Sequence, residues 1–322
     1  MAALAEQFPS TGIHDLRAFR APDLDPLLRE CEDEWRNSLA WNFDSSSALV
    51  RKFLDLHSLN GSALVDDSGV TGYSYFVFED NKGLVGDLYV AKRARTVHHE
   101  QLLIGSVLQQ IRSLGQVPRI EAQIMFLSAP LQPFACGFGS FEMFPREFLG
   151  LLLPRAAQTR PLRLPSHIAL EIWSEPDQEQ AAHLIPATYH SHIDSQINDQ
   201  YRTVSGARKF LQNIVQYPGC GVFQGQASVA AHDRRTGRLC GMLLSSLVAP
   251  GSGHITQVCV HPEYQGMGLG LELLRQSLDL LEAAGCRTVS LTVSAANTQA
   301  ARLYERAGFR PIRSFAAYVW QP

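Results

Sequence analysis

Apolar positions along the chain recur with two periods, and the changes between them mark out strands and helices. Residues 255–260 have the composition of a short buried strand, because the run is apolar, rich in β-branched residues and stopped by Pro262. After Gly270 the period becomes that of an amphipathic helix, whose apolar stripe is Leu271, Leu274, Leu278 and Leu281. Gly285 is expected to end this helix. The pattern predicts a strand, a glycine-rich turn and a helix in direct succession.

The same periodicities and turn residues predict elements on both sides of this stretch. In the first half we expect a strand at 13–19, helices at 22–37, 45–57 and 97–114, and strands at 63–65, 70–78, 84–90 and 120–127. Ser45 or Asp44 is the expected cap of the second helix. In the second half we expect strands at 167–173, 227–232, 239–248 and 288–293, and helices at 176–190 and 206–217.

The two halves repeat one order of elements, and they can be laid over one another. The matches lie at nearly one separation: Gly72 with Gly241, Val90 with Val260, Leu103 with Leu273, Leu108 with Leu278, Ile111 with Leu281, and Gly137-Phe138 with Gly308-Phe309. Agreement in element order as well as in residues indicates a duplication. We expect a first domain at 1–153, a proline-rich linker at 154–165 and a second domain at 166–322. The expected fold class is α/β (α+β), with a mixed, mostly antiparallel sheet flanked by helices in each domain.

Length, charge and cysteine usage narrow the class of protein. A chain of 322 residues has room for two cores, and its net charge of −3 lacks the basic field of a nucleic-acid binder. The six cysteines are scattered without a C-x-x-C pair, as expected of reduced thiols. No apolar run reaches the length of a membrane span, and residues 1–6 are too short in apolar length for a signal peptide. We therefore expect a cytoplasmic protein that binds neither membrane nor nucleic acid.

A glycine turn between a strand and a helix N-terminus forms a site for an anion. Glycines let the backbone approach a ligand, and the free N–H groups and dipole of the first helical turn add positive potential. The spacing here is Gln-x-x-Gly-x-Gly, filled by Gln265, Gly268 and Gly270. It lacks the lysine of a P-loop and the pattern of a dinucleotide site, which disfavours both kinds of site, and tight packing without a ligand is the alternative for the glycines.

A second motif follows the glycine turn, at Asn297-x-x-Ala300-x-x-Leu303-Tyr304-x-x-x-Gly308-Phe309. The two motifs, in this order and separation, closely resemble those of the GNAT superfamily of acyl-CoA-dependent N-acyltransferases. The resemblance implies two GNAT-like domains in tandem, the second of them catalytic. It also implies acetyl-CoA as a co-substrate, and no metal.

The resemblance also implies roles for individual residues. In the family, the strand before the turn splays from its neighbour and binds the pantetheine arm; here this strand includes Val258, Cys259 and Val260. Backbone amides of the turn would bind the pyrophosphate, and Asn297 with Ala300 would contact the cofactor arm. Tyr304 would protonate the departing thiolate while an amine attacks the acyl carbonyl directly. The turn residues concerned are Gln265, Gly266, Met267, Gly268, Leu269 and Gly270.

The general base stays open. Many relatives place a glutamate on the strand before the turn, where this chain has Thr256, Gln257 and Cys259. His254, His261, Glu171 and a water relay remain alternatives, and Cys259 could be an acylated nucleophile or a buried, inert thiol.

The segment between the first two helices of the second half lines the acceptor pocket in this family. Here residues 189–202 are dense in hydrogen-bonding side chains, with His190, Asp194, Asp199 and Tyr201 as candidate acceptor ligands. A metal site at His190, His192 and Asp194 lacks a partner motif and is set aside. A polar pocket with carboxylates suits a cationic amine.

The overlay predicts that the first domain has lost its cofactor site. Opposite Gln265, Gly266, Gly268 and Gly270 stand Arg95, Thr96, His98 and Glu100, whose side chains would fill the pyrophosphate space. Opposite Tyr304 stands Pro133 or Phe134, neither with a hydroxyl. We expect a scaffold, with a ligand of its own at Lys92, Arg93 and Arg95 as a secondary possibility.

The leading function is transfer of an acetyl group from acetyl-CoA to an amine of a small molecule or peptide. A non-catalytic acyl-CoA-binding regulator is the alternative, because no carboxylate base is evident. The tandem arrangement also resembles mycothiol synthase, a minor option. We expect a monomer or weak homodimer whose two domains form a pseudo-dimer.

Overall fold

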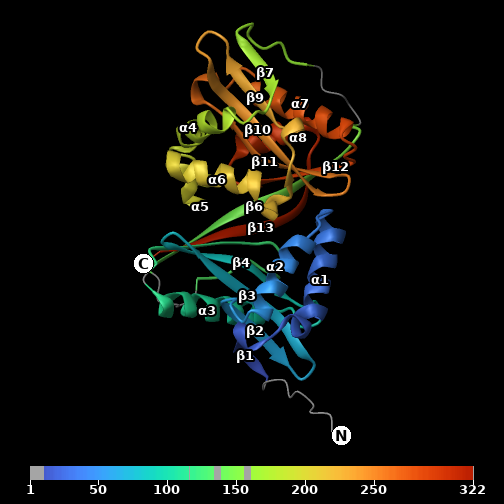
Figure 1. Ribbon diagram of the computed structural model, residues 1–322, viewed down its shortest axis with the longest axis vertical. Coiled ribbons are helices and arrows are strands. Elements are labelled where there is room, and N and C mark those ends of the chain that lie inside the picture. The colour runs from blue at the N-terminus through green and yellow to red at the C-terminus, as the bar shows by residue number, and fades with distance from the viewer. Residues whose placement is uncertain (1–10, 116, 134–138, 156–160, 322) are drawn as a thin grey trace. The chain divides into compact units, whose positions relative to one another are not determined.

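The computed structural model describes residues 11–115, 117–133, 139–155 and 161–321 (Figure 1). The chain divides into two compact units. Unit 1 comprises residues 1–37, 43–144 and 315–322, and unit 2 comprises residues 38–42 and 145–314. None of the described helices combines the length and apolar character that a membrane crossing requires.

Unit 1 contains one mixed sheet and three helices. Its elements, in chain order, are β1 (Gly12–Asp15), α1 (Ala21–Leu39), α2 (Asp44–Asp55), β2 (Gly61–Asp66), β3 (Gly69–Glu79), β4 (Lys82–Val90), α3 (Val97–Leu114), β5 (Arg119–Ile124), the start of β6 (Ser140–Leu152) and the end of β13 (Arg310–Gln321). The strand order is β1-β2-β3-β4-β5-β13, with β4 and β5 parallel and the other neighbours antiparallel.

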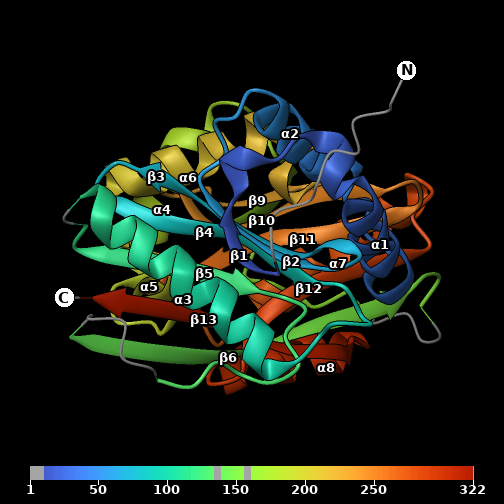
Figure 2. The same cartoon turned by 90° about the horizontal axis from the view of Figure 1, so that it is seen from below.

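Helix α3 covers one face of this sheet, and α1 and α2 cover the other (Figures 1 and 2). Residues that alternate along β4 show the two faces. Leu88 packs in one core with Leu103 of α3, whereas the Tyr89 hydroxyl donates to the Glu34 carboxylate of α1 over 2.7 Å.

Unit 2 repeats this arrangement. Its elements are the greater part of β6, β7 (Ile168–Ile172), α4 (Asp177–Tyr189), α5 (Asp194–Ile197), α6 (Val204–Gln216), β8 (Val222–Phe223), β9 (Val229–Asp233), β10 (Arg238–Ala249), β11 (Ser252–Val260), α7 (Leu269–Ala283), β12 (Thr288–Ser294), α8 (Thr298–Ala307) and the start of β13. The strand order is β7-β9-β10-β11-β12-β6, with β11 and β12 parallel. One face packs on α7 and α8, and the other packs on α4 and α6.

The predicted elements are confirmed in type, and α3 has the predicted ends. Two local predictions were wrong. The first strand ends at Asp15, because this side chain accepts the Arg17 N–H over 2.9 Å and caps a 3₁₀ turn. The N-cap of α2 is Phe43, without a side-chain bond, so neither Ser45 nor Asp44 has that role. Strands β6, β8 and β13 and helices α5 and α8 were not predicted.

The two units do not have the predicted boundaries, which placed the end of the first domain at residue 153 and the start of the second at residue 166. Residues 145–152 of β6 pair with β12 and belong to unit 2. Residues 315–321 of β13 belong to unit 1, where Ala316–Trp320 pair with β5. Each sheet is therefore completed by a strand from the other half of the sequence. Of the predicted linker, residues 156–160 lie outside the described residues, as do Gly137-Phe138 and Phe134.

Candidate active site

Two neighbouring parallel strands of unit 2 separate where the glycine turn begins. β11 pairs with β12 from Ser252 to Ile255, whereas its pairing with β10 continues to Val260. Hydrogen bonds of an antiparallel pair alternate, so Val258 and Val260 direct their backbone groups away from β10. Their carbonyls accept bonds on that side, from the Tyr189 hydroxyl at 3.2 Å and from Gln265 Nε2 at 3.0 Å. The splay exposes a strand edge, but the backbone of Cys259 is directed to β10.

The glycine turn leads from this edge into α7. Gly266 and Gly268 have φ angles of +78° and +86°, a backbone region that favours glycine. Gly268 is the N-cap of α7, so the first N–H groups of that helix have no intrahelical partner. A Cβ atom on Gly266 would meet nothing within 4 Å, which leaves open space beside the turn. A Cβ atom on Gly268 would lie 2.8 Å from Leu162 of the predicted linker.

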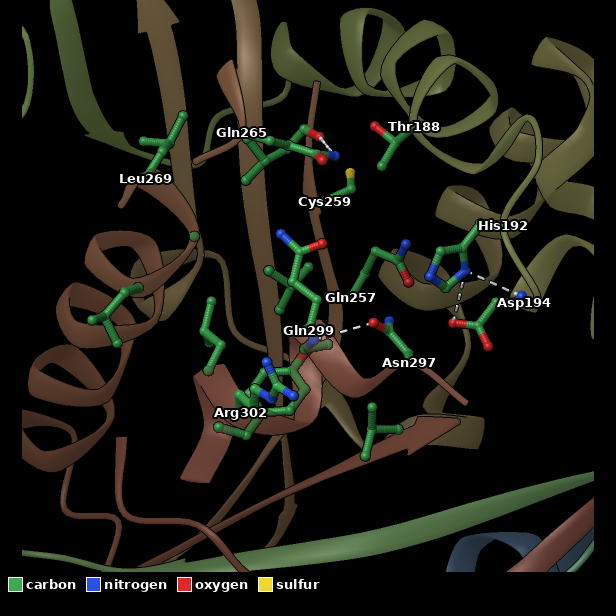
Figure 3. Close-up of a pocket in the computed structure, with 18 of the residues that line it drawn as sticks. Thr188, His192, Asp194, Gln257, Cys259, Gln265, Leu269, Asn297, Gln299 and Arg302 are labelled. Atoms are coloured by element: carbon green, nitrogen blue, oxygen red, sulfur yellow. Dashed lines mark hydrogen bonds and ion pairs between the residues drawn. The ribbon is translucent and has the colours of Figure 1, made fainter. Parts of the chain in front are cut away.

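The splay and the turn open into a cavity of about 900 Å³ (Figure 3). Leu269 at the start of α7 and Asp194 of α5 lie at opposite sides of this view. Of the residues predicted to hold the cofactor, the cavity is lined by Val258, Cys259, Val260, Gln265, Gly266, Gly268, Leu269, Gly270, Asn297 and Ala300, and Met267 instead packs on the core. Asn297 Oδ1 accepts the Ala300 N–H over 3.1 Å and so caps α8.

Helix α8 adds positive charge that the sequence motifs did not reveal. Arg302 and Arg306 are exposed, and both line the cavity. They occur at helical spacing between the motif residues Ala300 and Gly308. In the sequence, only the positive charge and the helical spacing of these two arginines could have indicated that they belong to the site.

Tyr304 lines the cavity from the same helix, and its ring packs edge-on against Phe309, with ring centroids 6.1 Å apart. Burial raises the pKa of the Tyr304 hydroxyl, and the Asp194 carboxylate raises it further, while Arg146 opposes the rise. The hydroxyl therefore stays protonated at neutral pH. It is able to act as a proton donor inside the cavity.

Asp194 is the one carboxylate among the described residues that line the cavity. The Ser294 hydroxyl donates to its Oδ1 atom. The backbone N–H of Asp194 donates to His192 Nδ1 over 3.1 Å, so the neutral His192 imidazole carries its proton on Nε2. His192 therefore presents a donor, and the Asp194 carboxylate is the acceptor available to an amine.

Behind Asp194 lies a neutral hydrogen-bond network. Gln257 is 5% exposed; its Nε2 donates to the Tyr189 hydroxyl over 3.0 Å, and its Oε1 accepts from Tyr201 over 3.2 Å. Burial raises the pKa of both tyrosines. Of the predicted acceptor ligands, Asp194 lines the cavity and Tyr201 contacts a lining residue. His190 and Asp199 do not line it.

The candidate bases named from the sequence do not gather at the cavity. His254 is 6% exposed, stacks between Trp41 and Phe148, and burial lowers its pKa to about 3. Glu171 and His261 do not line the cavity. Burial raises the pKa of the Cys259 thiol, which favours an inert thiol over a nucleophile. Within the part of the chain that the structure describes, no three histidine, cysteine or acidic side chains form a metal-binding group.

Comparisons with known proteins agree with this geometry. Residues 193–309 match the acetyltransferase (GNAT) family. The chain is 39% identical over 98 residues to the mycothiol acetyltransferase of Mycobacteroides abscessus, which covers 30% of this chain and 33% of that protein. It is 33% identical over 86 residues to the ribosomal protein bS18-alanine N-acetyltransferase of Escherichia coli strain K12, which covers 27% of this chain and 57% of that protein. The chain thus spans about a third and about half of the lengths of these relatives.

Two solved structures show the fold of the whole chain. A GCN5-related N-acetyltransferase from Sphaerobacter thermophilus aligns with a TM-score of 0.65 at 17% identity, covering 98% of both chains. A tandem GNAT protein from the clavulanic acid biosynthesis pathway aligns with a TM-score of 0.55 at 17% identity, covering 82% of both. The predicted fold class, two GNAT-like domains in tandem, is confirmed.

Proposed function

Because residues 193–309 form a GNAT-family acetyltransferase domain, we propose that the chain is an N-acetyltransferase that moves an acetyl group from acetyl-CoA to an amine. One observation carries the proposal. A splayed strand edge, a glycine turn at a helix N-terminus and a partly buried tyrosine all open into the same cavity. Mycothiol and ribosomal-protein acetyltransferases, to which the chain is similar, support the same reaction class.

The residues of the cavity suit acetyl-CoA. Open space beside Gly266 and the free N–H groups of the first turn of α7 fit a pyrophosphate. Arg302 and Arg306 add positive charge for the phosphates. The N–H groups of Val258 and Val260 face the splay, where they would bind the pantetheine arm. When bound, acetyl-CoA supplies the acetyl group as a thioester.

In the proposed reaction a nitrogen–carbon bond forms and the carbon–sulfur bond breaks. A backbone N–H of the splayed edge polarises the acyl carbonyl, and the Tyr304 hydroxyl gives its proton to the leaving thiolate. The Asp194 carboxylate binds and orients the acceptor in its ammonium form, which loses one proton to this carboxylate or to water before its nitrogen attacks. The proton that the nitrogen loses after the attack restores the Tyr304 hydroxyl through water. The raised pKa of Tyr304 keeps the acid in its protonated form throughout the neutral range.

The proposal is tested by pairing calorimetry of CoA binding with an assay of CoA release. The assay offers small-molecule amines, amino acids, aminoglycosides and peptides that begin with alanine. We expect one CoA site per chain and turnover with at least one acceptor class. Tight binding of CoA together with no turnover of any class would contradict the proposal and favour the non-catalytic acyl-CoA-binding regulator.

A further inference from the structure

Strand β6 brings a positive charge to the acceptor end of the site. Arg146 of this strand pairs with Ser294 at the end of β12, so the two side chains lie on the same face of the sheet. The Ser294 hydroxyl donates to Asp194, the carboxylate of the cavity. Arg146 and Asp194 therefore lie on either side of one serine. This arrangement could not be predicted from the sequence, because β6 precedes β12 by more than a hundred residues.

The guanidinium of Arg146 has little to bind within the protein. Its Nη2 donates to Thr292 Oγ1 at 3.4 Å, a long bond to a residue that lines the cavity. Its Nε is buried and has no hydrogen-bond partner among the described residues. Within the same part of the chain Arg146 forms no ion pair. A half-buried guanidinium without an anion is costly, so the arrangement is typical of a group that waits for one.

Arg146 does not itself line the cavity, but it contacts Thr292, which does, and its charge acts on two tyrosines at this end. It opposes the effect of Asp194 on the pKa of both Tyr304 and Tyr201. The cofactor's phosphates are not the missing anion, because the glycine turn and Leu269 lie across the cavity from Asp194 (Figure 3). The anion must come from the other substrate.

We propose that Arg146 binds an oxyanion of the acceptor, so that the acceptor is a small amine that also carries a carboxylate or phosphate. Asp194 binds the ammonium group, and Arg146 binds the oxyanion through its planar fork of donors. This inference rests on the proposed acetyltransferase function and names the acceptor class for it. The chemistry fits amino acids first, and aminoalkyl phosphates second.

Matched acceptor pairs test the proposal in the full-length chain. L-alanine is compared with L-alaninamide, and O-phosphoethanolamine with ethanolamine, in native protein, Arg146→Gln and Arg146→Lys. The control is Arg208→Gln, an exposed arginine of α6 that pairs with Glu179. The ratio of variant to native kcat/KM is taken for each acceptor, so that differences in amine reactivity cancel.

We expect Arg146→Gln to lower kcat/KM by about 10- to 100-fold for the anionic member of the preferred pair. The neutral member should change less than about threefold, and Arg146→Lys should recover part of the loss. The preferred pair, carboxylate or phosphate, identifies the oxyanion. Unchanged CoA affinity by calorimetry shows that the variants are folded.

Two results would overturn the inference while leaving the acetyltransferase function intact. One is native protein that acetylates neutral amines as well as anionic ones. The other is an equal loss of kcat for both members of each pair, which would mean that Arg146 acts through Tyr304. If no amine is acetylated, the proposed function fails, and the inference is judged by binding alone. Calorimetry of CoA-saturated protein must then show anionic amines binding more tightly than neutral ones, with the difference lost in Arg146→Gln.

Discussion

The two units have the same framework, yet a glycine turn beside a cavity in unit 2 is replaced in unit 1 by charged side chains that have partners within that unit. In both, a parallel strand pair separates at matching positions: β11 leaves β12 after Ile255, and β4 leaves β5 after Val85. Beyond each splay a side chain donates to the last carbonyl of the strand. Gln265 Nε2 donates to Val260 over 3.0 Å, and Arg95 Nε donates to Val90 over 3.0 Å. This one hydrogen bond is thus kept although the residue that donates it has changed.

The two units also share a close contact between the sheet and the helix that follows the separated strand. A Cβ atom on Gly83 would lie 3.2 Å from Ile111 of α3, and one on Gly253 would lie 3.2 Å from Leu281 of α7. These glycines let each helix approach its sheet closely. The duplication inferred from leucines and glycines is therefore visible in the packing of both units.

The difference lies at the helix N-terminus. The buried Glu100 carboxylate of α3 accepts the Ser128 N–H over 2.8 Å and its hydroxyl over 2.9 Å. Arg95 pairs with Glu34 at 2.8 Å, and its guanidinium stacks on the Tyr89 ring at 4.9 Å. The side chains that stand opposite the glycine turn are thus bound to other residues of unit 1. Because Arg95 already pairs with Glu34, this pairing argues against the secondary possibility that Arg95 binds a separate ligand in the first domain.

The shared framework of the two units therefore does not require the glycine turn, since α3 follows its strand without one. We propose that the sheet and its helices supply the stability and that the turn supplies cofactor binding. Four predictions test this comparison, from the loss of a cooperative fold to a change in pH dependence.

The largest effect is expected when the second half is expressed alone. Residues 166–322 lack β6, whose Phe148 and Leu149 are 1% and 6% exposed. Each such side chain stabilises by roughly 1.5–3 kcal/mol, and their loss also leaves β12 with an open edge. Because domains are stable by only about 5–15 kcal/mol, we expect no cooperative unfolding by circular dichroism.

A fragment that begins at residue 139 restores β6 and is the control for this experiment. It should unfold cooperatively and bind CoA. A monomeric 166–322 fragment with the melting temperature of the whole chain would show that β6 is dispensable.

The second prediction concerns Tyr304→Phe, which removes a hydroxyl and keeps the packing. A positioned general acid contributes about 10²- to 10⁴-fold, so kcat should fall by that factor while CoA affinity changes little. The measurements are steady-state kinetics with an acceptor from the screen, and calorimetry. Tyr217→Phe, at an exposed site, is the control. Unchanged kcat would mean that water protonates the thiolate.

The third prediction concerns Gly268 and Gly270 of the turn, which have bulkier counterparts in the first unit. Replacing Gly268 with alanine and Gly270 with valine should weaken CoA binding, because Gly268 has a φ of +86° and a Cβ atom there meets Leu162 at 2.8 Å. Backbone strain of roughly 1–3 kcal/mol corresponds to about 5- to 150-fold in affinity. Gly115→Ala, in extended backbone with open space around it, is the control. Equal affinity in the double variant would show that the turn does not bind the cofactor.

The last prediction, a change of about 1.4 kcal/mol for each pH unit, concerns Asp87, which the overlay places opposite Gln257. Asp87 is buried, accepts the Tyr73 hydroxyl over 2.7 Å, and has its pKa raised by burial from 3.8 to about 6. The folded protein then holds a proton that the unfolded chain releases, so the free energy of unfolding falls as pH rises from about 4 to 6. The total is about 3 kcal/mol at roughly 1.4 kcal/mol per pKa unit.

Asp87→Asn copies the neutral amide of the second unit and should abolish this fall. Urea denaturation of both proteins at pH 4, 5, 6 and 7 measures it. Parallel pH profiles for native protein and variant would assign the dependence to another group.

Local sequence determined the elements and the cofactor side of the site. Apolar period, glycine position and proline are properties of a short window, so α3, α7, the turn at 265–270 and the position of Tyr304 could be predicted. The helix N-terminus, the glycine conformations and the acid are each encoded within a few residues. The family motifs lie in the same stretch of sequence, so the residue patterns and the family resemblance indicated the same site.

Only the tertiary structure showed which polar and charged side chains from distant segments lie together at the proposed acceptor end of the cavity. β6 and β13 pair with strands far away in the sequence, and no local period states which partner a strand will take. Asp194 reaches Ser294, and Arg146 reaches Thr292, only because those pairings form. Contacts between distant segments arise from the closure of the whole sheet, so the place of Arg146 beside Thr292 became visible only in the folded protein, whereas Asp194 could be named from the sequence.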